Sequence, residues 1–265
     1  MTFARSMPFA APYRRHRGTL VIAAHGTRSA AGERTLARLA AAVRRLRPGH
    51  RVELAFLEIS RPLLADVLPG LPGPVTVVPL LLAGGYHVHL DLPNVVAATR
   101  PDTTVTAPLG PHPLLTSALV RRLNEAGLRA TDTVVLAAAG SSDPAALSDV
   151  RSAARLLAVR LARPVTAAFA AGASPTVHEM LDRMRHGPAP RVALASYLLA
   201  PGFFHEKLVK AGADVVTAPI GADLDLAALV WARHDQAAGS SRSPLTISSA
   251  PASREGPASA PTNIS

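Results

Sequence analysis

The sequence predicts an α/β protein built from two doubly wound parallel-sheet lobes in tandem, with an active cleft between them. Short apolar runs rich in β-branched residues alternate with helical patterns, and four segments recur in the same order at nearly constant spacing. Fully apolar strands are typical of parallel sheets that helices cover on both faces. The chain of 265 residues is long enough to bury a core in each lobe.

Strands and helices are expected to alternate through the first half. The apolar runs TLVIAA (19–24), RVELAFL (51–57) and VTVVPLLLA (75–83) are predicted strands. Helical spacing follows in ERTLARLAAAVRRL (33–46) and again in PLLTSALVRRLNEAG (113–127). The expected order in each half, β-α-β-α-β-α-β-α, is that of an open α/β sheet.

The second half of the chain repeats the first. TVVLAAAGSSD (133–143) echoes TLVIAAHGTRS (19–29), and VALASYLLAPGFF (192–204) echoes VTVVPLLLAGGYH (75–87). Two further pairs keep the same order, and all four offsets lie between 111 and 117 residues. The repeat therefore predicts two homologous lobes.

This repeat divides the chain into four parts. Residues 18–128 are predicted to form an N-terminal lobe that carries the site, and residues 129–237 a C-terminal lobe that is a degenerate repeat. Residues 1–17 are predicted to be a disordered basic arm. Residues 238–265, rich in Ser, Pro and Ala, are predicted to be a disordered tail.

The composition excludes several kinds of site. Cysteine is absent, so disulfides, thiolate metal ligands and cysteine nucleophiles are ruled out. About half of the net charge of +10 lies in the two terminal segments, and no basic run is interleaved with aromatics, which argues against nucleic-acid binding. The remaining positive bias suits an anionic small molecule. No apolar run is long enough to span a membrane, and the expected compartment is the cytoplasm.

Polar side chains follow three predicted strands of the first half. His25 comes after the first strand and Glu58 after the second, and His87 and His89 come after the third, behind a Gly-Gly turn. Ligands of open parallel sheets bind outside the carboxyl ends of the strands, so these groups are expected at one edge of the sheet. His25, Glu58 and His87 together have the composition of a nitrogen and oxygen metal site with open coordination positions.

The second half provides an internal comparison for these three residues. Its equivalents of His25, Glu58 and His87 are, in that order, Ala139, Ala171 and Phe204. The strand ends persist there although the polar groups are absent, so the polar groups are better explained by chemistry than by folding. His205 lies one position beyond the equivalent of His87 and is predicted to stand at a helix start.

Other residues near the strand ends have two interpretations each. Gly84–Gly85 makes the turn and would also let a flat ligand approach the backbone. Asp91 is expected to cap the helix that follows it. Arg28 and Arg61 are either surface residues or partners of a substrate carboxylate. His89 would face away from the preceding histidine in an extended segment, so it is a secondary candidate for a substrate contact.

Three motifs resemble those of one protein family. AHGTR (24–28), FLEISRP (56–62) and PLLLAGGYHVHLDLP (79–93) are similar, in this order, to motifs of the class II tetrapyrrole chelatases of the sirohydrochlorin cobalt/iron chelatase type. The third motif is long and fairly specific. The resemblance extends over both lobes, because the family includes two-lobe tandem members. It implies a chelatase-like fold with a single active site in the first lobe.

The resemblance implies that His25, Glu58 and His87 bind the metal and act in catalysis. The implied reaction inserts Fe²⁺ or Co²⁺ into sirohydrochlorin, in siroheme or cobalamin biosynthesis, with Ni²⁺ or Zn²⁺ accepted in vitro and no organic cofactor. Insertion removes two pyrrole protons, and an imidazole with a reference pKa of about 6.5 can present a metal or accept a proton. The expected contacts of the anionic tetrapyrrole are Arg28, Arg61, Gly84, Gly85, Tyr86 and His89.

Three alternatives remain open at this point. A metal or tetrapyrrole carrier would bind without turnover, since two lobes around a cleft also describe hinged binding proteins. A hydrolase would use a metal-bound water, although the sequence shows no nucleophile elbow. An inactive paralogue would have a regulatory role, against which the complete first-lobe triad argues. A two-lobe chain can close its own cleft, so a monomer is expected.

Overall fold

The computed structural model describes residues 18–84, 91–185 and 191–240, and within them the chain forms two four-stranded parallel sheets. The strand orders are β2-β1-β3-β4 and β6-β5-β7-β8. The strands are β1 (Thr19–Ala24), β2 (Val52–Phe56), β3 (Val75–Pro79), β4 (Thr104–Val105), β5 (Thr133–Ala138), β6 (Val165–Phe169), β7 (Val192–Tyr197) and β8 (Val215–Val216). Both sheets are parallel throughout, which confirms the predicted fold class.

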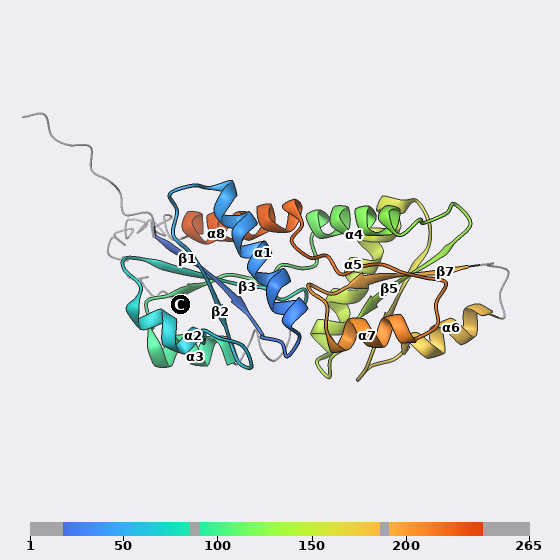
Figure 1. Cartoon of the computed structure of the whole chain (residues 1–265), viewed down its shortest axis with the longest axis horizontal. Helices are drawn as coiled ribbons and strands as arrows, with labels where there is room; N and C mark the ends of the chain where they lie inside the picture. The colour runs from blue at the N-terminus through green and yellow to red at the C-terminus, as the bar shows by residue number, and fades with distance from the viewer. Residues whose placement is uncertain (1–17, 85–90, 186–190, 241–265) are drawn as a thin grey trace, which may run out of the picture.

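Helices join consecutive strands and cover both faces of each sheet (Figure 1). They are α1 (Ala30–Leu46), α2 (Leu64–Val67) with the short 3₁₀ helix η1 (Leu68–Gly70), α3 (Leu92–Thr99), α4 (Pro113–Glu125), α5 (Pro144–Leu161), α6 (Val177–Arg185), α7 (Phe203–Lys210) and α8 (Leu224–Ser240). Within the described residues, no helix is long and apolar enough to cross a membrane.

Equivalent residues begin the long helix after the first strand of each half. Ser29 caps α1 by accepting a hydrogen bond from the backbone N–H of Gly32, at 3.2 Å. Asp143 caps α5 in the same way, with its carboxylate 2.8 Å from the backbone nitrogen of Ala145. Each cap satisfies a backbone donor that the first helical turn leaves without a partner. The repeat in sequence is therefore also a repeat in local structure.

Two predicted boundaries differ from the structure. The strand predicted at 75–83 ends at Pro79 in the structure, and beyond it Leu82 and Gly84 bond to the other lobe, as described below. Helix α8 continues to Ser240, three residues into the predicted tail. The predicted arm at 1–17 and the tail from 241 lie outside the described residues, and the division into domains stays a prediction.

The last helix of each half packs on the sheet of the other half. α4 ends the first half in sequence, but it packs against α5 and β7 of the second lobe. α8 ends the second half and packs against α1 and β3 of the first (Figure 1). One continuous hydrophobic core consequently includes buried residues of both sheets, such as Leu20, Leu136 and Leu229. This exchange joins the two lobes and holds the cleft between them in place.

Trp231 anchors α8 on the first lobe. Its side chain is buried, and the indole Nε1 donates a hydrogen bond to the carbonyl oxygen of Val43 in α1, at 2.9 Å. The guanidinium of Arg47 lies 4.4 Å from the centre of the indole ring and also pairs with Asp235 on α8. The pKa of Asp235 is lowered, chiefly by its hydrogen bond with Arg47. These contacts join α8, from the second half of the sequence, to α1 and Arg47 of the first half.

Replacing Trp231 with phenylalanine is expected to lower the free energy of unfolding by about 1–2 kcal/mol, because it removes one hydrogen bond and weakens a cation–π contact while keeping most of the buried apolar volume. Urea unfolding followed by circular dichroism measures the loss. Val159→Ala, at a highly exposed position on α5, is the control and should change stability by less than about 0.5 kcal/mol. Equal stability of the two variants would contradict the anchoring role.

Candidate active site

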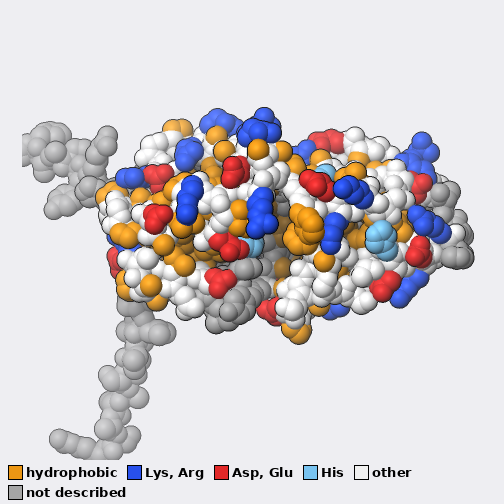
Figure 2. All heavy atoms as spheres, turned by 60° about the horizontal axis from the view of Figure 1, so that its bottom comes forward, with side chains coloured by type: hydrophobic (Ala, Val, Ile, Leu, Met, Phe, Trp, Pro, Cys, Tyr) orange, Lys and Arg blue, Asp and Glu red, His pale blue; other side chains and the backbone are white. Residues whose placement is uncertain are grey.

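A cleft opens between the lobes at the carboxyl ends of both sheets, with a volume of about 930 Å³. Its walls are the segments that follow the central strands, namely residues 24–29 and 80–84 from the first lobe and residues 138–142 and 197–205 from the second. Figure 2 shows the hollow where the lobes meet. This is the position at which open α/β sheets bind ligands.

His25 and Glu58 meet on the first-lobe side of this cleft. His25 directly follows β1, and Glu58 lies two residues beyond β2. The imidazole Nδ1 is 3.2 Å from the carboxylate Oε1, and the two side chains are 37% and 58% exposed. His25 lines the cleft, and Glu58 itself is not part of the lining, although the adjacent Ile59 is. The adjacent parallel strands β1 and β2 therefore bring together two groups that are 33 positions apart in sequence.

The backbone that carries this pair is duplicated in the second lobe. The backbone N–H of Glu58 donates to the carbonyl of His25 at 3.1 Å, and that of Ala171 donates to Ala139 at 3.0 Å. The two halves differ here in their side chains, while this hydrogen bond is kept. The fold therefore forms this edge without an imidazole or a carboxylate, which supports a chemical reason for His25 and Glu58.

The backbone conformation at each of these two strand ends requires a glycine, Gly26 in the first half and Gly140 in the second. Gly26 has a φ of +109°, and a Cβ at this position would collide with the carbonyl oxygen of Glu58. Gly140 has a φ of +101° and meets the carbonyl oxygen of Ala171 in the same way. Positive φ and close approach of two backbones both favour glycine. Gly26 thus has a structural role, whereas the second half forms the same backbone with alanine in place of the histidine before it.

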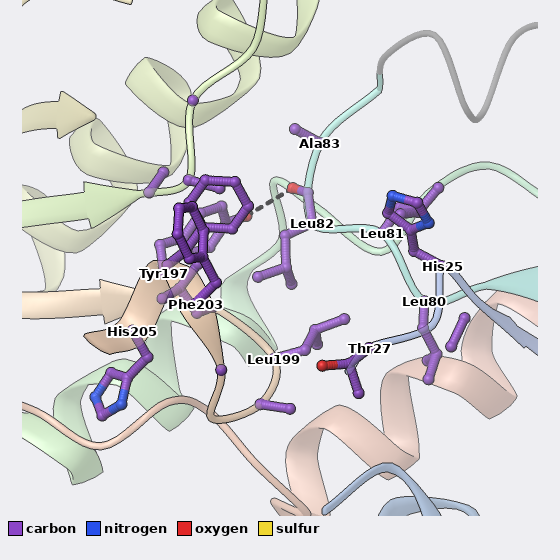
Figure 3. Close-up of a pocket in the computed structure, with 18 of the residues that line it drawn as sticks. His25, Thr27, Leu80, Leu81, Leu82, Ala83, Tyr197, Leu199, Phe203 and His205 are labelled. Carbon is purple, nitrogen blue, oxygen red and sulfur yellow. Dashed lines mark hydrogen bonds between the residues drawn. The ribbon is translucent and has the colours of Figure 1, made fainter. Parts of the chain in front are cut away.

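The segment that leads to the third motif is held by the second lobe. The backbone N–H of Gly84 donates to the Asp149 carboxylate on α5 at 2.8 Å, and the hydroxyl of Tyr197 donates to the carbonyl of Leu82 at 2.9 Å (Figure 3). Burial, and secondarily the charge of Asp149, raise the pKa of Tyr197, so its hydroxyl keeps its proton as a donor. The second lobe therefore holds this segment at Leu82 and Gly84.

Part of the predicted site lies outside the described residues. These predicted residues are Gly85, Tyr86, His87 and His89. Among the residues that the structure does describe, no group of three or more His, Asp or Glu side chains is arranged to hold a metal ion. His25 and Glu58 form two thirds of the predicted triad, and the place of His87 in it stays a prediction.

A family model matches both halves of the chain, at residues 19–126 and 133–237. The chain belongs to the CbiX family. This confirms the resemblance in sequence, and the two matched stretches coincide with the two halves of the repeat. The CbiX match also covers both strand ends from which His25 and Glu58 project.

Relatives of this CbiX-family chain come from bacteria and archaea. It is 28% identical to the sirohydrochlorin ferrochelatase of Priestia megaterium over 169 residues, which are 59% of this chain and 63% of that protein. It is 32% identical to the sirohydrochlorin cobaltochelatase of Saccharolobus solfataricus over 89 residues, which are 28% of this chain and 70% of that protein. The chain thus spans slightly less than two thirds of the ferrochelatase.

Solved structures share the two-lobe fold of this CbiX-family chain. SirB from Bacillus subtilis with Fe³⁺ superimposes with a TM-score of 0.72 at 23% identity, covering 85% of this chain and 97% of that one. The sirohydrochlorin chelatase SirB from the subspecies spizizenii, in complex with cobalt, gives 0.68 at 21% identity, covering 84% and 96%. At these sequence identities, the structural similarity establishes the fold alone.

The remaining predicted residues take different positions in the CbiX fold. Arg28 is exposed and lines the cleft, whereas Arg61 is exposed and lies outside the lining. Asp91 occupies the N-cap position of α3, but its backbone is already helical and its side chain makes no capping hydrogen bond, so the predicted capping role is wrong. His205 is the third residue of α7 and lines the cleft, with its Nε2 3.0 Å from the carbonyl of Thr217.

Ser60 is a site residue that the sequence analysis missed. Its buried hydroxyl accepts from the backbone N–H of Thr27 and donates to the carbonyl of Thr27, both at 3.0 Å. This pair ties the loop after Glu58 to the loop after His25. At the equivalent position the second half has Ala173, so a serine present in one copy only was the available signal.

Replacing Ser60 with alanine is expected to cost about 1–3 kcal/mol of unfolding free energy, because two backbone groups of Thr27 lose their partner. Denaturant titration measures this cost. The control is Ser152→Ala on α5, where the hydroxyl bonds to Ser148 on an exposed helix face. If Ser60→Ala and Ser152→Ala were equally stable, the loops would be held by other contacts.

Proposed function

We propose that the protein is a sirohydrochlorin chelatase, which inserts Fe²⁺ or Co²⁺ into sirohydrochlorin. The observation that carries this proposal is the His25–Glu58 pair, with 3.2 Å between Nδ1 and Oε1 on the first-lobe side of the cleft. Imidazole and carboxylate bind these divalent ions without the strong retention of a four-thiolate site. A chelatase requires ligands that can release the metal. The names of the two relatives support the same reaction class.

The cleft suits a large flat substrate. Its volume of about 930 Å³ falls within the range of small-molecule sites, towards the upper end. Arg28 is the cation among the described lining residues, and no Asp or Glu is part of that lining. A substrate with several carboxylates therefore meets a favourable field. A single chain supplies both walls, so we expect a monomer, and we place the reaction in the cytoplasm.

The proposed reaction is balanced by protons. Two pyrrole N–H protons leave the macrocycle as one divalent ion enters, so the net charge of the complex is conserved when both protons are released. In this proposal His25 presents the metal, together with Glu58 and His87, from the first-lobe wall. A group of the same set that is not occupied by the metal accepts a proton. The iron product would lead to siroheme and the cobalt product to cobalamin.

Anaerobic absorbance of sirohydrochlorin tests the proposal. The metal-free macrocycle is mixed with Fe²⁺ or, separately, Co²⁺, with and without the protein, and the spectrum of the metallated product is followed. A chelatase is expected to accelerate insertion above the protein-free rate, and the two rates rank the metals. Binding of the macrocycle without acceleration would overturn the enzyme and indicate a carrier.

A further inference from the structure

Two adjacent phenylalanines stand exposed at the second-lobe wall of the cleft. Phe203 and Phe204 begin α7 and are 64% and 38% exposed. Their ring centroids are 5.3 Å apart at an interplanar angle of 72°, and both residues line the cleft. Large aromatic side chains normally bury most of their surface, so an exposed aromatic pair at a concave site indicates a ligand.

Several second-lobe residues next to this pair in the cleft lining are apolar. Leu198, Leu199 and Ala200 precede the pair, and Ala139 lies beside them in the lining. Across the cleft the first lobe presents His25 and polar neighbours, and Figure 3 shows Phe203 and His25 on opposite sides of the segment that contains Leu82. Ala139 and Phe204 are the repeat equivalents of His25 and His87. The degenerate half has thus replaced polar groups by an apolar surface.

A cation lies over one ring of the aromatic pair. The Nζ of Lys207, one helical turn along α7, is 4.8 Å from the centre of the Phe203 ring. An ammonium at this distance from an aromatic face is held by a cation–π interaction. Lys207 is not part of the cleft lining, but its ammonium lies next to a residue that is, within reach of an anionic group bound beside Phe203.

We propose that Phe203 and Phe204 form an aromatic platform for a flat, conjugated, polyanionic macrocycle, one ring offering its face and the other, at 72°, its edge, and that Lys207 binds one of its peripheral carboxylates. The inference rests on the proposed chelatase function and adds which lobe contacts the macrocycle and which contacts the metal. The second lobe holds the macrocycle, and the first lobe presents the metal to its open face. Stacking on aromatic side chains tolerates variation in the ligand, whereas the cation selects for its charge.

Equilibrium binding of metal-free sirohydrochlorin, followed by its absorbance, tests the platform. The variant Phe203→Ala/Phe204→Ala is expected to raise Kd at least about tenfold, while Phe203→Tyr/Phe204→Tyr, which keeps both rings, stays within about threefold of wild type. Val209→Ala is the matched control, because Val209 is exposed on the same helix but does not line the cleft. A Kd for the double alanine variant within twofold of wild type would overturn the platform.

Substitutions of two lysines test the proposed contact between Lys207 and a carboxylate of the macrocycle. Lys207→Gln is expected to raise Kd by about threefold to tenfold at low salt and to reduce the dependence of Kd on salt concentration. Lys210→Gln removes the same charge from the same helix. Neither lysine is part of the cleft lining, but among the described residues only Lys207 lies over a ring that is, so the effect of Lys210→Gln should be small. Equal effects of the two substitutions would show that only the overall charge matters and would overturn the role of Lys207.

The same titration separates this inference from the proposed function. If wild type does not bind the macrocycle, both fail. If wild type binds and inserts metal but the double alanine variant binds equally well, only the platform fails.

Discussion

Replacing His25 with alanine is expected to slow metal insertion by about a hundredfold to ten-thousandfold, because it removes the imidazole that lines the first-lobe wall. The melting temperature should change by less than about 2 °C, since the second half forms the same strand end with alanine at this position. Initial rates from the anaerobic absorbance assay and a thermal melt measure the two quantities. The affinity for the metal-free macrocycle should stay within about threefold of wild type, because in our proposal the opposite lobe holds it.

Two companion variants sharpen this experiment. Glu58→Gln keeps the size of the side chain that contacts His25 but removes its charge, so an intermediate loss of rate is expected. His178→Ala removes an exposed histidine outside the cleft and should leave the rate unchanged. A His25→Ala protein that retains more than half of the wild-type rate would show that the chemistry lies elsewhere.

Replacing Gly26 with alanine is expected to lower the free energy of unfolding by more than about 4 kcal/mol, or to prevent folding. Two costs combine at this position. A φ of +109° is unfavourable for any residue with a side chain, and the new Cβ would strike the carbonyl oxygen of Glu58, which belongs to the backbone and cannot rotate away. Urea unfolding measures the loss, and poor yield of soluble protein would accompany it.

Two other glycines separate these costs. Gly49 also has a positive φ, +82°, but a Cβ there would meet no atom within 4 Å, so Gly49→Ala should cost only about 1–2 kcal/mol. Gly140 has both the positive φ and the backbone collision, so Gly140→Ala should destabilise as much as Gly26→Ala. If Gly26→Ala were no worse than Gly49→Ala, the loop of Glu58 would be free to move, and the site would be less rigid than its hydrogen bonds indicate.

The sequence predicts the features that follow from local pattern and repetition. The central strands are buried along their length, so their apolar runs stand out, and parallel pairing brings their ends to one edge. This is why His25 and Glu58 could be placed together without a structure. The repeat added a second test, because the degenerate half keeps the backbone around Ala139 and Ala171 without the polar groups.

The features that the sequence does not predict depend on contacts between distant parts of the chain. Asp149 holds Gly84 across 65 positions and Tyr197 holds Leu82 across 115, and no spacing rule links these pairs. The sequence also does not predict the exchange of α4 and α8. The pattern of an amphipathic helix indicates that one face is buried, but not which of two similar sheets covers it. The strand predicted at 75–83 was right as far as Pro79, and the second-lobe contacts of Leu82 and Gly84 beyond that point left no mark in the local pattern.

The transfer of metal within the complex is the central claim, and one single-turnover measurement tests it most directly. Protein mixed with one equivalent of Co²⁺ under anaerobic conditions is combined rapidly with sirohydrochlorin and an excess of a strong chelator, and the cobalt product is quantified by absorbance. The account predicts that wild type forms product despite the chelator and that His25→Ala forms none. Loss of product in wild type whenever the chelator is present, or equal product from both proteins, would contradict the presentation of metal by the first lobe.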